Sequence, residues 1–439
     1  MVFELLLFAD LRAVSLVNKD FHTLVEPLLY SKIQWTWLES HTPPPITLLL
    51  RSILCRPQLA AYIRRVIFNG DTFYLPHFRG TVPKIPISRT ELDKPIAFIR
   101  RTRVPYGDLW IQELRHGTMD AFVALLLLQL SNLTCLYLGP NFTKQSQLIG
   151  MVLRSALCEP VDYGLPNFQH LQDVSFNLKA DIHRNRSIRN TTDILPFFYL
   201  PTVQRISASI DNPVIFTWPA AHAPVPLGLT SLDLTFVREV HLGQLLSVTR
   251  TLKTLRWAWY HDTRLQVEDQ VNTAIIDLGQ IVAAISRVRG TLTDLTISAA
   301  CENDHGFFPP LKTKGFLNEM VNFEMLKRFE APLPFLMGFS PDTAKRLEDV
   351  IPRNIEFLTI TDDLKLHDEW EWDDHTLLGV IQSWLENWKA STPHLRGISL
   401  LLRDTDDEWG PRMRNELGKV CAQAGIQLEI IKMLKDLCD

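Results

Sequence analysis

A short apolar pattern recurs along most of this 439-residue chain and constrains the fold more than any other feature. Each copy contains three apolar residues. Two residues of any type separate the first from the second, and one residue of any type separates the second from the third. The copies are Leu133/Leu136/Leu138, Leu171/Val174/Phe176, Val203/Ile206/Ala208, Leu229/Leu232/Leu234, Leu252/Leu255/Trp257, Leu292/Leu295/Ile297, Leu326/Phe329/Ala331, Ile355/Leu358/Ile360 and Leu395/Ile398/Leu400. The alternation at the end of each copy predicts a short strand with one buried face.

The pattern L-x-x-L-x-L resembles that of leucine-rich repeats, in which the final x-L-x forms a strand. The starts of successive copies lie 23 to 40 residues apart, so the array is irregular and carries insertions. Ile63/Val66/Phe68 forms a possible earlier copy, and Ile426/Leu428/Ile430 a possible closing strand.

Helical segments are expected between the strands, because residues 274–288, 374–388 and 411–424 carry apolar residues at helical spacing. A unit of strand, loop and helix cannot bury its apolar face alone, so neighbouring units must stack. The predicted fold class is therefore α/β, with an irregular leucine-rich-repeat solenoid and a curved parallel sheet behind a short N-terminal helical segment. The alternative is an ordinary α/β domain with a flat parallel sheet.

The N-terminal segment, residues 10–33, has its own helical pattern. Asp10 can cap a helix start, and Pro27 predicts a break near its position. The spacing of the apolar residues predicts one stripe on one helix face, formed by Leu11, Val14, Val17, Phe21 and Leu24. Periodicity alone also allows an ordinary amphipathic core helix.

The residue order in this segment is more specific than its period. Leu11, the run Ser15 to Lys19, Phe21 and the run Pro27 to Tyr30 resemble the second half of an F-box, in the form common in fungal F-box proteins. The resemblance implies binding to the Skp adaptor of cullin-based ubiquitin ligases. It places adaptor contacts at Leu11, Val14, Leu16, Val17 and Phe21.

The segment departs from the F-box pattern at its start. The family opens with Leu-Pro and a full first helix, whereas here residues 1–7 run almost directly into Phe8. The predicted organisation is a partial F-box-like motif at 1–33, a connector with a first repeat and a Pro/Arg-rich surface insertion at 34–104, and the repeat solenoid at 105–439.

The composition narrows the class of protein. The chain is 46% hydrophobic and 21% charged, which fits a globular protein. A net charge of −4 argues against nucleic acid as the main partner, and no apolar run is long enough to span a bilayer. Six scattered cysteines fit reduced thiols in a cytoplasmic or nuclear protein. No phosphate loop, dinucleotide fingerprint or nucleophile elbow is present, so we expect neither an enzyme nor a cofactor.

Two acidic stretches near the C-terminus could bind a cation. Residues 367–375 combine two histidines with several carboxylates, and residues 404–410 resemble part of a calcium loop without its closing glutamate. We favour solvated acidic loops over metal sites in both places.

The same stretches suggest a docking site. Both follow predicted strands of consecutive repeats, so they should lie side by side along one rim. The acidic residues would attract a basic segment of a substrate and the indoles would anchor it. The predicted contact residues are Asp368, Glu369, Trp370, Trp372, Asp406 and Trp409. Tryptophans tucked into the core beside a solubilising rim would explain the pattern equally well.

Three functional hypotheses follow. The first is a substrate-recruiting adaptor subunit of a Skp–cullin–F-box ubiquitin ligase. The second is a non-enzymatic repeat scaffold whose F-box-like segment only caps the solenoid. The third, a hydrolase built on residues 367–375, has the least support.

Overall fold

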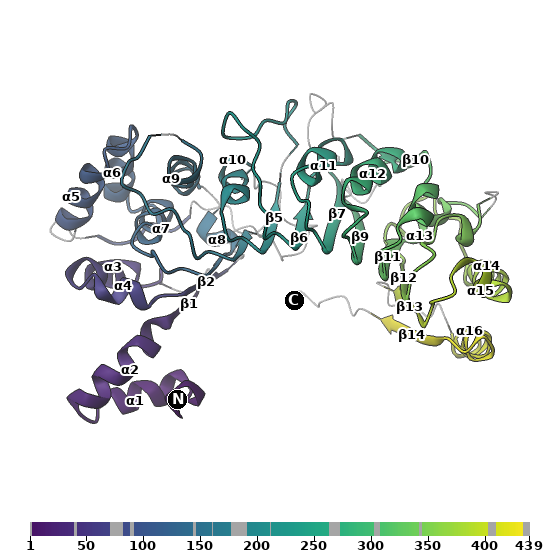
Figure 1. The fold of residues 1–439 in the computed structure, drawn as a ribbon, viewed down its shortest axis with the longest axis horizontal. Coiled ribbons are helices and arrows are strands. Elements are labelled where there is room, and N and C mark those ends of the chain that lie inside the picture. Colours follow the sequence, from purple (N-terminus) through teal and green to yellow (C-terminus); the bar gives the residue numbers. More distant parts are fainter. Residues whose placement is uncertain are drawn as a thin grey trace. The chain divides into compact units, whose positions relative to one another are not determined.

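The computed structural model describes residues 2–38, 42–70, 82–87, 92–143, 146–159, 161–176, 191–210, 212–262, 273–302, 308–341, 345–402 and 410–432. The chain divides into two compact units. Figure 1 labels their helices and strands. Unit 1 comprises Met1–Asp211 and Thr217–Leu229, and unit 2 comprises Asn212–Phe216 and Thr230–Asp439. Both units combine helices with an open parallel sheet, which confirms the predicted α/β class.

Unit 1 contains five parallel strands in the order β1-β2-β3-β4-β5. They are β1 Lys32–Thr36, β2 Arg65–Asn69, β3 Cys135–Leu138, β4 Asp173–Phe176 and β5 Arg205–Ser209. The helical elements are η1 Val2–Leu5, α1 Phe8–Ser15, α2 Lys19–Ser31, α3 Ile46–Cys55, α4 Gln58–Tyr62, α5 Asp93–Thr102, α6 Gly107–His116, α7 Met119–Leu127, α8 Pro140–Thr143, α9 Leu148–Leu157, α10 Thr191–Ile194 and η5 Leu195–Tyr199.

Unit 2 contains seven strands in the order β6-β7-β9-β11-β12-β13-β14, and a separate parallel pair, β8 and β10. The strands are β6 Ser231–Thr235, β7 Thr254–Asp262, β8 Ile275–Asp277, β9 Asp294–Glu302, β10 Lys312–Lys314, β11 Arg328–Pro332, β12 Phe357–Thr361, β13 Gly397–Leu402 and β14 Gln427–Lys432. The helical elements are α11 Glu239–Leu246, α12 Leu278–Ile285, η6 Ser286–Val288, η7 Asn318–Asn322, α13 Leu333–Met337, η8 Leu347–Asp349, α14 Asp374–Glu386, α15 Trp388–Ser391 and α16 Pro411–Ala424.

The recurring apolar pattern fixes the register of both sheets. In unit 1, Val66 pairs with Leu136, Leu136 with Val174, and Val174 with Ile206. In unit 2 the middle position of each motif likewise pairs with the middle position of the next, in the order Leu232, Leu255, Leu295, Phe329, Leu358, Ile398 and Leu428. The apolar side chains therefore form continuous rows, and all nine predicted strands are confirmed.

The first position of each motif is also buried, just before the strand begins. Burying a leucine contributes roughly 1.5–3 kcal/mol, so three buried positions in each copy favour the observed pairing over a shift by one residue. In Figure 1, α11 and α12 lie to one side of β6, β7 and β9, and they complete the core there.

The N-terminal segment differs from the prediction of one helix. It forms α1 and α2, separated at residues 16–18, because the Asn18 side chain accepts a hydrogen bond from the Phe21 backbone N–H at 2.8 Å and starts a new helix. Asp10 is not the cap, since α1 begins at Phe8 with Leu7 at the N-cap position.

The break expected at Pro27 is also wrong, because α2 continues to Ser31. A proline inside a helix costs about 3 kcal/mol. The flanking contacts offset this cost: Val25 is fully buried, and the nearly buried Glu26 accepts a hydrogen bond from the Arg56 guanidinium at 2.8 Å.

Three further expectations needed correction. The connector predicted from residue 34 belongs in part to β1, and the Trp35 ring stacks on Phe68 with centroids 4.8 Å apart. The Pro/Arg-rich insertion contains α5, whose Pro95 lies in the first turn, where proline is tolerated. The helix predicted from residue 274 begins only at Leu278, after β8. In the described part of the chain, no helix is long and apolar enough to cross a membrane.

Candidate functional site

The first candidate surface lies on η1, α1 and α2. Helices α1 and α2 pack against each other, with Leu11 buried, and the Phe3 ring meets the Phe21 ring edge-on at 6.1 Å. Seven large apolar side chains on and between these elements are exposed to solvent, and we call them the N-terminal apolar surface: Leu5, Leu7, Phe8, Leu16, Val17, Phe21 and Leu24.

The predicted adaptor-binding residues divide between interior and surface. Leu11 is buried and Val14 is half-buried, so both contribute to helix packing. Leu16 and Val17 are 80% and 67% exposed, and Phe21 is 37% exposed. The division follows the helix bounds, because Leu11 and Val14 lie within α1, which packs against α2, whereas Leu16 and Val17 lie in the turn between the helices.

The C-terminal half of α2 packs against the rest of unit 1. Val25 and Glu26 are buried there, and Arg56 and His22 lie 2.8 and 3.5 Å from the Glu26 carboxylate. Within α1, Leu11 is the one buried residue. Because clustered exposed apolar side chains are uncommon on a surface without a partner, this end of unit 1 is a candidate protein-binding site.

The second candidate surface is the segment 362–373, which follows β12 and which we call the Trp370 loop. Buried contacts hold it in place. The Asp363 carboxylate accepts a hydrogen bond from the Ala299 backbone N–H at 2.6 Å, and the Glu371 backbone N–H donates to the Phe339 carbonyl at 3.0 Å. Leu364 has φ +69°, a left-handed conformation that is uncommon for a leucine. Because buried contacts already order this loop, a partner that binds its exposed residues would cause little further loss of conformational entropy.

The predicted docking residues have different positions in this loop. Trp372 is buried, and its Nε1–H donates to the Gly338 carbonyl at 2.8 Å, so it is part of the core. Trp370 is half-buried, and its Nε1–H donates to the Trp372 carbonyl at 2.9 Å, which leaves its ring as the available contact surface. Asp368 is exposed and Glu369 partly exposed. Asp406 and Trp409 lie outside the described residues.

Other members of the acidic stretch have structural roles. Asp373 is the N-cap of α14, where its carboxylate accepts the Thr376 backbone N–H at 2.8 Å. This hydrogen bond and one from the Thr376 hydroxyl lower the pKa of Asp373. The sequence contained the signal for this cap, since an aspartate four residues before the first buried leucine of a helix is a typical helix start.

The histidines of this stretch do not form a metal site. His367 is buried beside Phe308, with ring centroids 4.5 Å apart, whereas His375 is exposed. Burial lowers the pKa of His367, although a hydrogen bond to the Pro309 backbone opposes this shift. Across the described ranges, no group of three or more histidines, cysteines or carboxylates could hold a metal ion.

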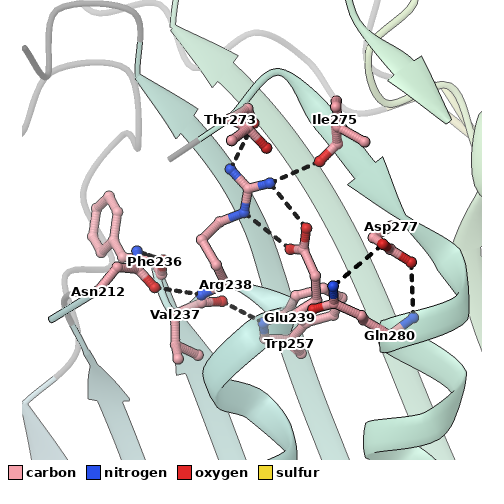
Figure 2. A network of polar contacts seen from close by, with 10 residues as sticks. All are labelled: Asn212, Phe236, Val237, Arg238, Glu239, Trp257, Thr273, Ile275, Asp277 and Gln280. Atoms are coloured by element: carbon pink, nitrogen blue, oxygen red, sulfur yellow. Dashed lines mark hydrogen bonds and ion pairs between the residues drawn. The ribbon is translucent and has the colours of Figure 1, made fainter. Parts of the chain in front are cut away.

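Sequence reasoning missed a buried polar network in unit 2 (Figure 2). The guanidinium of Arg238 forms two hydrogen bonds of 3.0 Å with the carboxylate of Glu239, and both side chains are almost fully buried. The same guanidinium donates to the backbone carbonyls of Thr273 and Ile275, each at 2.9 Å, and lies 4.6 Å from the Trp259 ring centroid.

This network joins three parts of unit 2 that are separate in sequence. Besides the Arg238 contacts to β7 and to the start of β8, the Asn212 side chain accepts the Arg238 backbone N–H at 2.7 Å and donates to the Phe236 carbonyl at 2.8 Å. The adjacent residues Arg238 and Glu239 gave no motif that could have revealed these contacts. We assign the network a structural role, because it ties Asn212 and the backbone at Ile275 to the start of α11.

A scan against protein-family models and a search of the curated proteins found no match to this chain.

Proposed function

We propose that this chain is a substrate-recruiting adaptor subunit of a Skp–cullin–F-box ubiquitin ligase. The observation that carries the proposal is the N-terminal apolar surface, which coincides with the segment that resembles an F-box. Leu16 and Val17 are available to a partner, whereas the opposite end of α2 is fixed to unit 1.

The repeat pattern supports the second half of this proposal. Equivalent positions of successive motifs pair in adjacent strands within each unit, as expected for stacked leucine-rich repeats. The solenoid would hold the substrate, and the Trp370 loop would contribute to its binding. Catalysis would take place in other subunits of the ligase. This chain would act by proximity, because holding a substrate close to the ubiquitin-loaded conjugating enzyme raises the effective concentration of the substrate.

The alternative is a repeat scaffold in which the N-terminal helices act only as a cap. A cap covers the end of an array by burying apolar side chains against it. Burial in α1 is limited to Leu11, while Leu7, Phe8, Leu16 and Val17 are exposed, and this distribution favours docking over capping.

Co-purification with purified Skp adaptor by size-exclusion chromatography tests the proposal. The full chain should form a complex that the Leu16→Asp/Phe21→Asp double variant fails to form, because two charges would have to be buried in an apolar interface. The control is Val225→Asp/Leu227→Asp, which changes two exposed apolar residues elsewhere in unit 1 and should retain the complex.

Circular dichroism and thermal unfolding must first show that all three proteins are folded. A folded wild-type chain that forms no complex would refute the adaptor proposal and favour the scaffold. A complex that survives in the Leu16→Asp/Phe21→Asp variant would show that the adaptor binds through another surface.

A further inference from the structure

The residues that lead into five neighbouring strands of unit 2 lie side by side at the N-terminal edge of its sheet. Just before the strands begin, the backbone ladder runs from Lys253 through Thr293, Lys327 and Glu356 to Arg396, and the N–H of each residue donates to the carbonyl of the one before it. These residues precede β7, β9, β11, β12 and β13, which are adjacent in that order. Side chains from distant parts of the sequence therefore share one edge.

This edge carries a surplus of positive charge. We define it as the residues between the preceding helical element and the first position of each strand, namely 247–254, 289–294, 323–328, 350–357 and 392–397, all of which the structure describes. Its charged residues are seven cations, which we call the basic edge, against three carboxylates: Arg250, Lys253, Arg289, Lys327, Arg328, Arg353 and Arg396, against Asp294, Glu324 and Glu356. All seven cations are exposed to solvent.

The carboxylates at this edge do not balance its cations. The Lys327 Nζ and the Arg396 Nη1 lie 3.1 and 3.5 Å from the two oxygens of Glu356, so one negative charge is shared by two positive ones. The hydrogen bond from Lys327 and the charges of Arg396 and Arg328 lower the pKa of Glu356. An edge with this excess of cations attracts an acidic partner.

Phe357 adds an apolar contact surface to the basic edge. It is half-buried at the start of β12, and the Arg328 guanidinium carbon lies 5.1 Å from its ring centroid. Its neighbour on β13 is Gly397, where an added Cβ would lie only 2.9 Å from the Phe357 ring. The glycine therefore lets the ring rest against β13, beside the cations, where an apolar residue of a partner can contact it.

The next outward-facing row of the sheet has mostly the opposite charge. It contains Asp233, Glu330 and Glu429 together with one cation, Arg256. An acidic segment is therefore directed along the edge and across the strands. The four interstrand steps from β7 to β13, each of about 4.8 Å, span roughly 19 Å, which an extended segment of about six residues covers.

We propose that the basic edge binds an extended acidic segment, about six residues long, of a protein partner. Its carboxylates would pair with Lys253, Lys327 and Arg396, and an apolar residue within it would contact the Phe357 ring. The proposal rests on the proposed function only in identifying this partner as the recruited substrate.

Fluorescence anisotropy of the full chain with labelled peptides tests the inference. Three probes share one sequence in which variable residues flank a central leucine, and the variable residue is glutamate, glutamine or lysine. The glutamate peptide should bind at least about tenfold more tightly than either of the others, because only its charge is complementary to the edge. Its affinity should fall as the salt concentration rises, because salt screens exposed charges.

A charge-reversal variant tests the location of the site. Lys253→Glu/Lys327→Glu should weaken glutamate-peptide binding at least about tenfold, because two attractive charges become repulsive. The matched control is Lys312→Glu/Lys419→Glu, which makes the same change in net charge at exposed lysines of β10 and α16 and should leave binding unchanged. If the first variant does not fold, Lys253→Gln/Lys327→Gln replaces it and should weaken binding at least about threefold.

Equal binding of the glutamate and glutamine peptides would overturn the inference, as would unchanged binding by a folded Lys253→Glu/Lys327→Glu protein. An equal loss in the control variant would also overturn it, because net charge alone would then explain the binding. Tighter binding of an oligouridylate with the same number of charges would replace the acidic protein segment with a nucleic acid. Absence of glutamate-peptide binding by the wild-type chain would refute the proposal outright. These results are independent of Skp co-purification, so the inference and the proposed adaptor function can fail separately.

Discussion

The buried Arg238–Glu239 pair gives the sharpest test of the packing in unit 2. Replacing Arg238 with Met keeps a long apolar side chain over Trp259 but removes the guanidinium. Glu239, only 6% exposed, would then be a buried carboxylate without its cation, and the carbonyls of Thr273 and Ile275 would lose a donor. Breaking such a pair by removing one partner costs about 3–5 kcal/mol.

The assay is urea-induced unfolding at neutral pH. The free energy of unfolding is taken from the transition whose midpoint changes when Arg238 is replaced. Arg238→Met should lower it by about 3–5 kcal/mol, whereas Arg238→Met/Glu239→Leu should recover a large part of this loss, because no charge stays buried. The control is Lys327→Met at the pair Lys327–Glu356, which is 3.1 Å long and has a mostly exposed lysine. Losing this solvent-exposed pair should lower the free energy of unfolding far less than losing the buried one.

Two results would contradict the reasoning. If Arg238→Met costs no more than Lys327→Met, the network does not stabilise unit 2. If the double variant is as unstable as Arg238→Met alone, the loss comes from the carbonyl contacts or from packing on Trp259, and the uncompensated carboxylate is not its cause.

Three further predictions concern buried polar and aromatic contacts. Asp120 accepts backbone N–H bonds at the start of α9, and burial raises its pKa to about 6, so the native state takes up a proton at a higher pH than the unfolded state. Protonation of Asp120 should therefore raise the free energy of unfolding by about 1 kcal/mol when the pH falls from 7 to 5. The Asp120→Asn variant should lack that part of the pH dependence. Gly150→Ala would place a methyl group in overlap with the Asp193 carboxylate, so the variant should melt at a lower temperature than the wild-type chain. An equal melting temperature would refute the described packing. Trp372→Phe removes the hydrogen bond to the Gly338 carbonyl and should destabilise the chain by about 1–3 kcal/mol in urea unfolding, while no measurable loss would show that the Trp370 loop does not depend on this bond.

The strands could be predicted from the sequence because their signal is local. Three apolar residues within six positions specify where each strand lies and which face is buried, and the same spacing brings Leu358 opposite Ile398 in the next strand. The helices at 374–386 and 411–424 were predictable for the same reason, since their apolar spacing and helix starts lie within the segments themselves.

The candidate sites were only partly predictable. The sequence identified Leu16, Val17 and Trp370, which the fold leaves accessible, but it also selected Leu11 and Trp372, which the fold buries. The regular spacing of apolar residues shows which residues share one face of a helix. It does not show whether another element buries that face.

Local patterns alone thus determined the α/β class, the strand positions and the parallel register. Tertiary structure decided the continuation of α2 through Pro27 and the pairing of the Arg238–Glu239 pair with two distant carbonyls. The physical reason is that a strand is specified by the spacing of its own side chains. Burial and the pairing of a charge instead depend on groups that the chain brings together from remote positions.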